Sequence, residues 1–245
     1  MFDHVTIRAS DRDASQRFYA TVLPALGIEL SHEGESYVEW RDFSLAQATA
    51  ERPVTRRLHL GFAAPSRAHV DAFWRAGMEA GYTSDGEPGH RPQYSPDYYG
   101  GFLLDPDGNS AEAVHHARPR RDGTLDHLWI RVADLGAARR FYERVGEHAG
   151  YARRSEERGR VGFGSASASF SVVEGPPTEQ VHLAFPAPDR ETVDGFHAAL
   201  VEAGYRDNGA PGERPVYHAG YYGAFVLDPD GNSVELVYHD RRGIV

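Results

Sequence analysis

Two sets of two histidines and one glutamate occur in the 245-residue chain, and both sets have separations of 55 and 53 residues. The first set is His4, His59 and Glu112, and the second is His127, His182 and Glu235. Two imidazoles and one carboxylate form a metal site with open positions for substrate or water, and they suit Fe, Mn, Zn or Ni. A glutamate inside an apolar strand also needs a compensating partner, because burying an unpaired charge is costly. We therefore expect each set to hold one divalent metal ion, although the sequence leaves open whether each site is built within one half of the chain or shared between the halves.

The equal separations result from an internal duplication of the chain. A shift of 123 residues aligns 59–116 with 182–239 without a gap, and 34 of these 58 positions are identical. The second set of ligands is therefore not independent of the first, although His182 and Glu235 persist where 24 aligned positions have diverged. We expect two homologous domains, residues 1–120 and 124–245, with a short polar joint at 118–123.

The residues around these ligands predict the same order of elements twice in each half. In the first strand, Val5 and Ile7 alternate with His4, which places the histidine on the face opposite the apolar one. A helix with apolar residues at helical spacing follows at about 13–26, and short strands come next. Each half thus has the order β-α-β-β-β twice, and the whole chain has four such modules.

The turn Asp-Pro-Asp-Gly-Asn leads twice into a strand that carries a glutamate, at residues 105–112 and 228–235. Together with the histidines on the first and fifth strands of each half, this motif resembles the vicinal oxygen chelate superfamily. That group includes glyoxalase I, extradiol dioxygenases, and the bleomycin and fosfomycin resistance proteins. The resemblance implies an α+β fold in which four βαβββ modules form two cupped, eight-stranded mixed sheets with flanking helices. It further implies that each half curls its own eight strands into a cup around one metal ion.

Two classes of function follow from this resemblance. The first is a metal-dependent enzyme, either a glyoxalase-like lyase or an extradiol-dioxygenase-like enzyme, that acts on a small substrate chelating the metal through adjacent oxygens. The alternative is a protein like the bleomycin resistance proteins, which sequesters a small molecule without catalysis. Glu174 is a candidate for the additional acidic ligand of glyoxalase I, and His218 is a candidate acid-base residue of the extradiol type. Gln47 and Ser95 replace them in the first half, so the second half is the better catalytic candidate.

Further residues are candidates for binding the substrate. Arg8 and Arg131 follow the first-strand histidines on the same face and could hold a carboxylate, or could form ordinary ion pairs at the strand end. Tyr94, Tyr217 and Tyr222 belong to a repeated loop and could form the pocket wall, or could only pack the loop on its sheet.

Composition limits the partners. The chain has 26 Lys+Arg and 36 Asp+Glu, a formal net charge of −10, and no basic run, which argues against nucleic acid and anionic membrane surfaces. It has no apolar run long enough to span a membrane and no cysteine, so thiolate ligands and disulfides are excluded. We expect a cytoplasmic protein with a small-molecule substrate, either a monomer with an internal pseudo-dimer or a homodimer.

Overall fold

The computed structural model describes residues 1–117, 123–165 and 169–240 and contains four βαβββ modules in the predicted order. Most of the predicted joint at 118–123 lies outside these residues. The first module contains β1 (His4–Ala9), α1 (Arg12–Val22), the 3-10 turn η1 (Leu23–Leu26), β2 (His32–Glu33), β3 (Tyr37–Trp40) and β4 (Phe43–Gln47). The second contains β5 (His59–Ala63), α2 (Arg67–Glu79), β6 (Thr83–His90), β7 (Tyr99–Leu104) and β8 (Ser110–His115). The third contains β9 (Leu125–Val132), α3 (Leu135–Ala149), β10 (Ala152–Glu157), β11 (Arg160–Gly164) and β12 (Ser169–Glu174). The fourth contains β13 (His182–Pro186), α4 (Arg190–Glu202), β14 (Asp207–Glu213), β15 (Tyr221–Leu227) and β16 (Ser233–His239).

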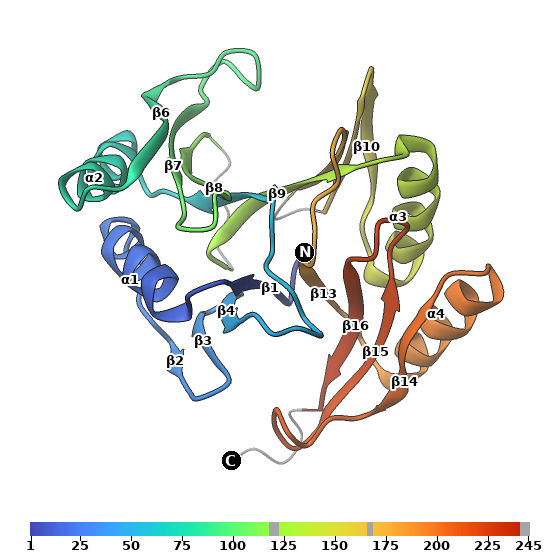
Figure 1. Ribbon diagram of the computed structural model, residues 1–245. Coiled ribbons are helices and arrows are strands. Elements are labelled where there is room, and N and C mark those ends of the chain that lie inside the picture. The colour runs from blue at the N-terminus through green and yellow to red at the C-terminus, as the bar shows by residue number, and fades with distance from the viewer. Residues whose placement is uncertain (118–122, 166–168, 241–245) are drawn as a thin grey trace.

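The strands form two eight-stranded mixed sheets, and each sheet contains strands from both halves of the sequence (Figure 1). The first sheet has the order β14-β15-β16-β13-β1-β4-β3-β2, and the second has the order β10-β11-β12-β9-β5-β8-β7-β6. The junctions are the antiparallel pairs β1–β13 and β5–β9. The α+β fold with two eight-stranded sheets is therefore confirmed.

The expectation that each half forms its own cup is wrong. Module one shares a sheet with module four, and module two shares a sheet with module three. The physical reason lies in the duplication, because the first strand of every module offers the same kind of unpaired edge. Alternation within a strand shows which face is buried, but it does not show which copy the edge will pair with. The division into residues 1–120 and 124–245 stays a proposal about the sequence repeat.

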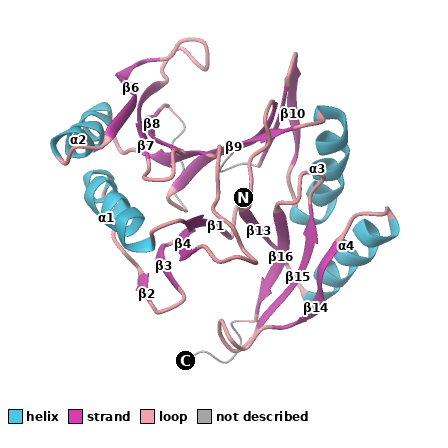
Figure 2. Ribbon diagram, viewed as in Figure 1, coloured by secondary structure: helices cyan, strands magenta, loops and turns pink. Residues whose placement is uncertain are grey.

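The helices hold each half together, whereas the strands join the two halves. Helix α1 contacts α2, and α3 contacts α4, and the two helix pairs lie at opposite sides of the molecule (Figure 2). The carboxyl group of Asp11 accepts a hydrogen bond from the Ala14 amide at the start of α1, as is usual at a helix N-terminus. The buried Tyr142 of α3 donates a hydrogen bond of 2.8 Å to Asp228, the first residue of the repeated turn, so the turn is anchored to the core. No helix in the described part of the chain is both long and apolar enough to cross a membrane.

Candidate metal centres

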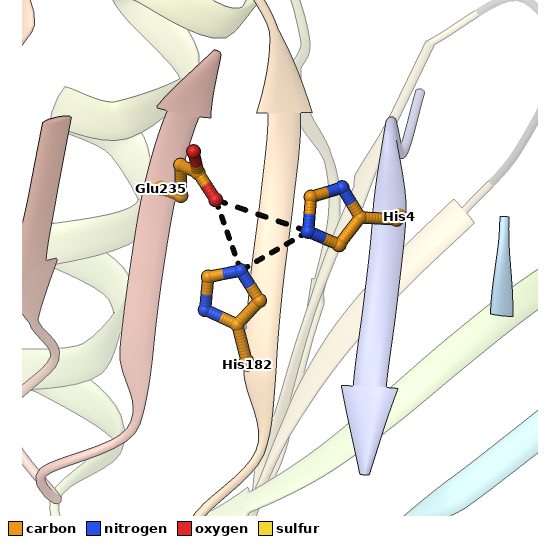
Figure 3. Close-up of side chains that lie close together, drawn as sticks. All are labelled: His4, His182 and Glu235. Carbon is orange, nitrogen blue, oxygen red and sulfur yellow. Dashed lines mark hydrogen bonds and ion pairs between the residues drawn. The ribbon is translucent and has the colours of Figure 1, made fainter. Parts of the chain in front are cut away.

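The first cluster, called site 1 from here on, joins His4, His182 and Glu235 on three adjacent strands (Figure 3). The Nε2 atom of His182 lies 3.0 Å from Oε2 of Glu235 and 3.2 Å from Nε2 of His4. The Nε2 atom of His4 lies 3.8 Å from the same carboxylate oxygen. Because β16, β13 and β1 are neighbours, their three side chains converge on one point on the concave face of the sheet.

The second cluster, called site 2, joins His59, Glu112 and His127 on β5, β8 and β9. The Nε2 atom of His59 lies 3.0 Å from Oε2 of Glu112 and 3.1 Å from Nε2 of His127. The Nε2 atom of His127 lies 3.2 Å from the same carboxylate oxygen. Site 2 is therefore the more compact of the two clusters.

The grouping expected from the sequence is wrong in one respect. The six candidate ligands all meet in groups of two histidines and one glutamate, but the two first-strand histidines are exchanged between the halves. His4 joins the ligands of the second half, and His127 joins those of the first half. The cause is the pairing of β1 with β13 and of β9 with β5.

The donor sets fit a divalent cation. In each site the candidate ligand atoms lie within 4.8 Å of one another. If two ligand nitrogens each lie about 2.1 Å from a metal ion and the angle at the metal is a right angle, the two nitrogens lie about 3.0 Å apart. The separations of 3.0–3.2 Å in site 2 match this value, and those of site 1 extend to 3.8 Å. Both glutamates are only 1 % exposed, so their charge requires a nearby cation or strong donors.

Hydrogen bonds from neighbouring residues orient the ligands. In site 1 the outer ring nitrogen of the first histidine donates to Asp3 at 2.9 Å, and that of the second histidine contacts the Ser233 hydroxyl at 3.0 Å. The Tyr221 hydroxyl donates to the second carboxylate oxygen at 2.7 Å. These contacts leave one nitrogen of each imidazole and one carboxylate oxygen facing the centre. The same roles in site 2 belong to Asp126, Ser110 and Tyr98.

The ligands are strongly coupled electrostatically. Burial opposes the charged form of His127, but hydrogen bonds to Asp126 and Glu112 outweigh it and raise its pKa to about 9. Burial likewise opposes the charged form of Glu112, but its hydrogen bonds from both histidines lower its pKa to about 2. In site 1, burial lowers the pKa of His182, whereas Asp3 and the site carboxylate overcome burial and raise the pKa of His4. A cation that binds at site 2 must therefore displace a proton.

A cavity of about 1180 Å³ lies over site 1. Both histidines of the site line it, and so do three of the residues expected from the sequence to act on a substrate, namely Arg8, Tyr217 and His218. His218 is connected to the site, because its Nε2 lies 2.9 Å from Nδ1 of His239, whose Nε2 lies 2.9 Å from Asp3. The structure thus brings these candidates together around site 1.

Other candidates lie elsewhere. Glu174 is exposed at the end of β12, in the sheet of site 2, so it cannot act beside His218 or serve as a ligand of site 1. The Tyr222 hydroxyl donates to Asp194 of α4, and Tyr222 does not line the cavity. The structure therefore does not bring Glu174 or Tyr222 to site 1, because Glu174 ends a strand of the other sheet and Tyr222 contacts a helix.

The two remaining substrate-binding candidates belong to the second sheet. Arg131 is exposed on β9, and Tyr94 is 43 % exposed and packs against Trp129 at a ring-centroid distance of 5.5 Å. Neither residue lines the cavity over site 1.

Several residues around site 1 were not identified from the sequence. Asp3 could have been found, because it precedes His4 directly and recurs before the other first-strand histidine. Glu39 on β3 and Arg52 on the loop after β4 line the cavity as well. Neither has a counterpart of the same type in the second half, so the duplication gave no signal for them.

Comparison with known proteins places the fold. The model of the Glyoxalase/Bleomycin resistance protein/Dioxygenase superfamily matches residues 1–113 and 124–236. The structure is similar to glyoxalase I from Zea mays, with a TM-score of 0.69 and 19% identity, over 97% of this chain and 92% of that one. It is also similar to a Bacillus subtilis protein assigned as a dioxygenase, with a TM-score of 0.69 and 14% identity, over 98% of this chain and 85% of that one. At these identities the likeness concerns the fold alone.

A third similarity covers one half of the chain. A glyoxalase/bleomycin resistance protein from Albidiferax ferrireducens is 34% identical over 47% of this chain and 99% of its own, with a TM-score of 0.44. No curated protein matches the sequence.

Proposed function

Because the chain belongs to the Glyoxalase/Bleomycin resistance protein/Dioxygenase superfamily, we propose that it is a metal-dependent enzyme whose working centre is site 1. The observation that supports this choice most strongly is the cavity of about 1180 Å³, which reaches both histidines of the site. A cavity of this size can enclose a small-molecule substrate together with its polar partners. Fe, Mn, Zn and Ni all suit this donor set, and the metal would supply Lewis-acid polarisation of a bound oxygen.

The protein's own residues have distinct roles in this proposal. His4, His182 and Glu235 hold the ion, while the open side of the cluster faces the cavity. Asp3 keeps the outer nitrogen of His4 protonated, so that Nε2 remains available as a ligand. His218 lies in the cavity wall; its Nδ1 donates to the Ala219 carbonyl, so it would accept or return a proton of the substrate at Nε2, in place of its contact with His239.

Arg8 would bind an anionic group of the substrate. Its guanidinium lines the cavity, and among the residues that the structure describes no carboxylate forms an ion pair with it. Burial and the positive charge of Arg52 lower the pKa of Arg8. A carboxylate of the substrate would relieve this repulsion through bidentate hydrogen bonds.

Both sites are completed by residues of a single chain, which supports a monomer with an internal pseudo-dimer as the working unit. The pairing of β1 with β13 and of β9 with β5 joins the two halves of one chain, and it takes the place of an interface between two separate chains. A second chain is not required for either metal centre.

Elemental analysis and a substrate screen test the proposal. Protein purified without a metal-affinity tag should contain divalent metal, and it should convert a member of a panel of α-keto aldehydes with thiols, or of catechols under air. His182→Ala should abolish turnover, whereas the matched variant His59→Ala should retain most of it, because it affects only site 2. Equal loss in both variants would contradict site 1 as the working centre. Metal-free protein that binds a small molecule unchanged would favour the sequestering alternative.

A further inference from the structure

The duplication places a large aromatic residue in one cup and a small residue at the same point in the other. Trp129 lies two residues after the first-strand histidine of site 2, and its Cα partner across the β5–β9 pair is His59. Thr6 lies two residues after the first-strand histidine of site 1, and its Cα partner across the β1–β13 pair is His182. The two positions are therefore equivalent in the two sheets.

The indole of Trp129 occupies the space next to the site 2 ligands. Its ring centroid lies 5.4 Å from that of His59 and 6.0 Å from that of His127. The guanidinium of Arg160 covers one face at 4.2 Å, and Tyr94 meets the indole edge to face at 5.5 Å. These are the distances of favourable cation–π and aromatic contacts. Site 2 thus contains an aromatic ring that belongs to the protein itself.

In site 1 the matching space belongs to the cavity. Thr6 lines it, and the position of Arg160 is taken by Tyr37, as the register of β3 with β4 and of β11 with β12 shows. The position of Tyr94 in the repeated loop is taken by Tyr217, which also lines the cavity and is 50 % exposed. The aromatic surroundings are present in site 1, while the central ring is replaced by a short hydroxyl side chain.

We infer that site 1 takes a ligand with an aromatic group of about indole size, which lies over Thr6 between Tyr37 and Tyr217. The inference rests on the proposed function in one respect, since the oxygens attached to the ring would face the metal ligands. The indole of Trp129 shows where the aromatic group of the ligand would lie, because it packs beside the two imidazoles of site 2 at the equivalent position of the duplicated sheet. Thr6 and Trp129 are then the residues that decide which of the two cups accepts a ligand.

Pairs of probes that differ only in the ring test this inference. Phenylglyoxylate and indole-3-glyoxylate have the same α-keto acid oxygens as pyruvate but add an aromatic group. Calorimetric titration of the metal-loaded full chain should show the aromatic acids binding about 10- to 100-fold more tightly than pyruvate, as expected for burial of a ring. Equal affinity for phenylglyoxylate and pyruvate would overturn the inference.

Two matched variants locate the binding. Thr6→Trp should remove the preference for the aromatic acids, and Trp129→Thr should raise the number of phenylglyoxylate molecules bound from one to two per chain. Unchanged affinity in Thr6→Trp, or binding lost only in Trp129→Thr, would contradict the assignment. If Thr6→Trp does not fold, Tyr217→Ala, in an exposed loop, should weaken binding of phenylglyoxylate while leaving that of pyruvate unchanged; equal weakening of both would also contradict it.

The metal content of each sample separates this inference from the proposed function. Metal-loaded protein without a preference for the ring overturns the inference alone. Protein without metal overturns the proposed function, and the inference is then decided with indole, which has no chelating oxygens. Saturation-transfer NMR should detect indole on the wild-type chain and not on Thr6→Trp, and an equal signal on both would overturn it.

Discussion

Replacing Gly61 by alanine should damage site 2 and leave site 1 intact. Gly61 is the Cα partner of His127 across the β5–β9 pair. A Cβ atom at residue 61 would lie 2.2 Å from Cε1, 2.4 Å from Nδ1 and 2.6 Å from Nε2 of that imidazole. In site 1 the equivalent position opposite His4 is already an alanine, Ala184. The distance between the first-strand histidine and the glutamate is also shorter in site 2, 3.2 Å against 3.8 Å.

The size of the effect follows from the distance that the ring must move. Ordinary van der Waals contact begins at 3.4 Å, so the imidazole of His127 has to retreat by about 1.2 Å from a Cβ at 2.2 Å. Metal–ligand distances tolerate deviations of only about 0.2 Å. Disturbing the support of a metal ligand typically costs 10- to 100-fold in affinity, and we expect a loss in that range at site 2.

Competition titration of Gly61→Ala with a chromophoric chelator measures this effect. The two binding steps of the wild-type chain should remain, with one of them weakened 10- to 100-fold. Ala184→Gly is the matched control, because it also changes one residue opposite a first-strand histidine but introduces no atom near site 2. Two unchanged affinities in Gly61→Ala, or the same weakening in Ala184→Gly, would refute the steric reasoning.

Three further predictions follow from the buried charges. Because the pKa of His127 is about 9 without metal, the apparent metal affinity of site 2 should fall about tenfold per pH unit from pH 9 to pH 7. Calorimetry at pH 7.5 in buffers of different ionisation enthalpy should show that about one proton is released when the metal binds. A metal affinity independent of pH would contradict this prediction. In metal-free protein the raised pKa of His127 gives a stabilisation that is complete below pH 6.5 and disappears as the pH rises through 9. The lowered pKa of Glu112 gives a stabilisation that is complete above pH 4.5 and disappears as the pH falls towards 2. Urea unfolding should therefore show the greatest stability between pH 4.5 and pH 6.5. Tyr142→Phe should lower the free energy of unfolding by about 1–3 kcal/mol, because the buried carboxyl of Asp228 loses one of its hydrogen-bond donors, and an unchanged urea midpoint would show that this hydrogen bond contributes little.

The local features of the fold could be predicted from the sequence. Alternation along the first strand assigned Val5 and Ile7 to the core, and both are at most 1 % exposed, whereas His4 lies on the concave face. The repeated turn and the apolar stripes defined all four modules. These features depend on residues close together in the chain, so periodicity is sufficient to identify them.

The assembly of the sites could not be predicted in the same way. Which copy of a strand pairs with β1 depends on contacts between residues far apart in the sequence, and the two copies present nearly the same edge. A shift of one residue also exchanges the faces of a strand. Tyr222 donates to Asp194 of α4, whereas the neighbouring Tyr221 of the same repeated segment donates to Glu235. Glu174 shows the limit of face assignment at a strand end, where the side chain reaches solvent.

Metal stoichiometry of two double variants tests most directly whether the sites are shared between the halves. His4 and His182 lie in one site and His59 lies in the other. The chain carrying His4→Ala and His182→Ala should therefore retain one divalent ion, held at site 2, while the chain carrying His4→Ala and His59→Ala should retain none. The opposite result, no ion in the first chain and one ion in the second, would show that each half builds its own site and would contradict the account.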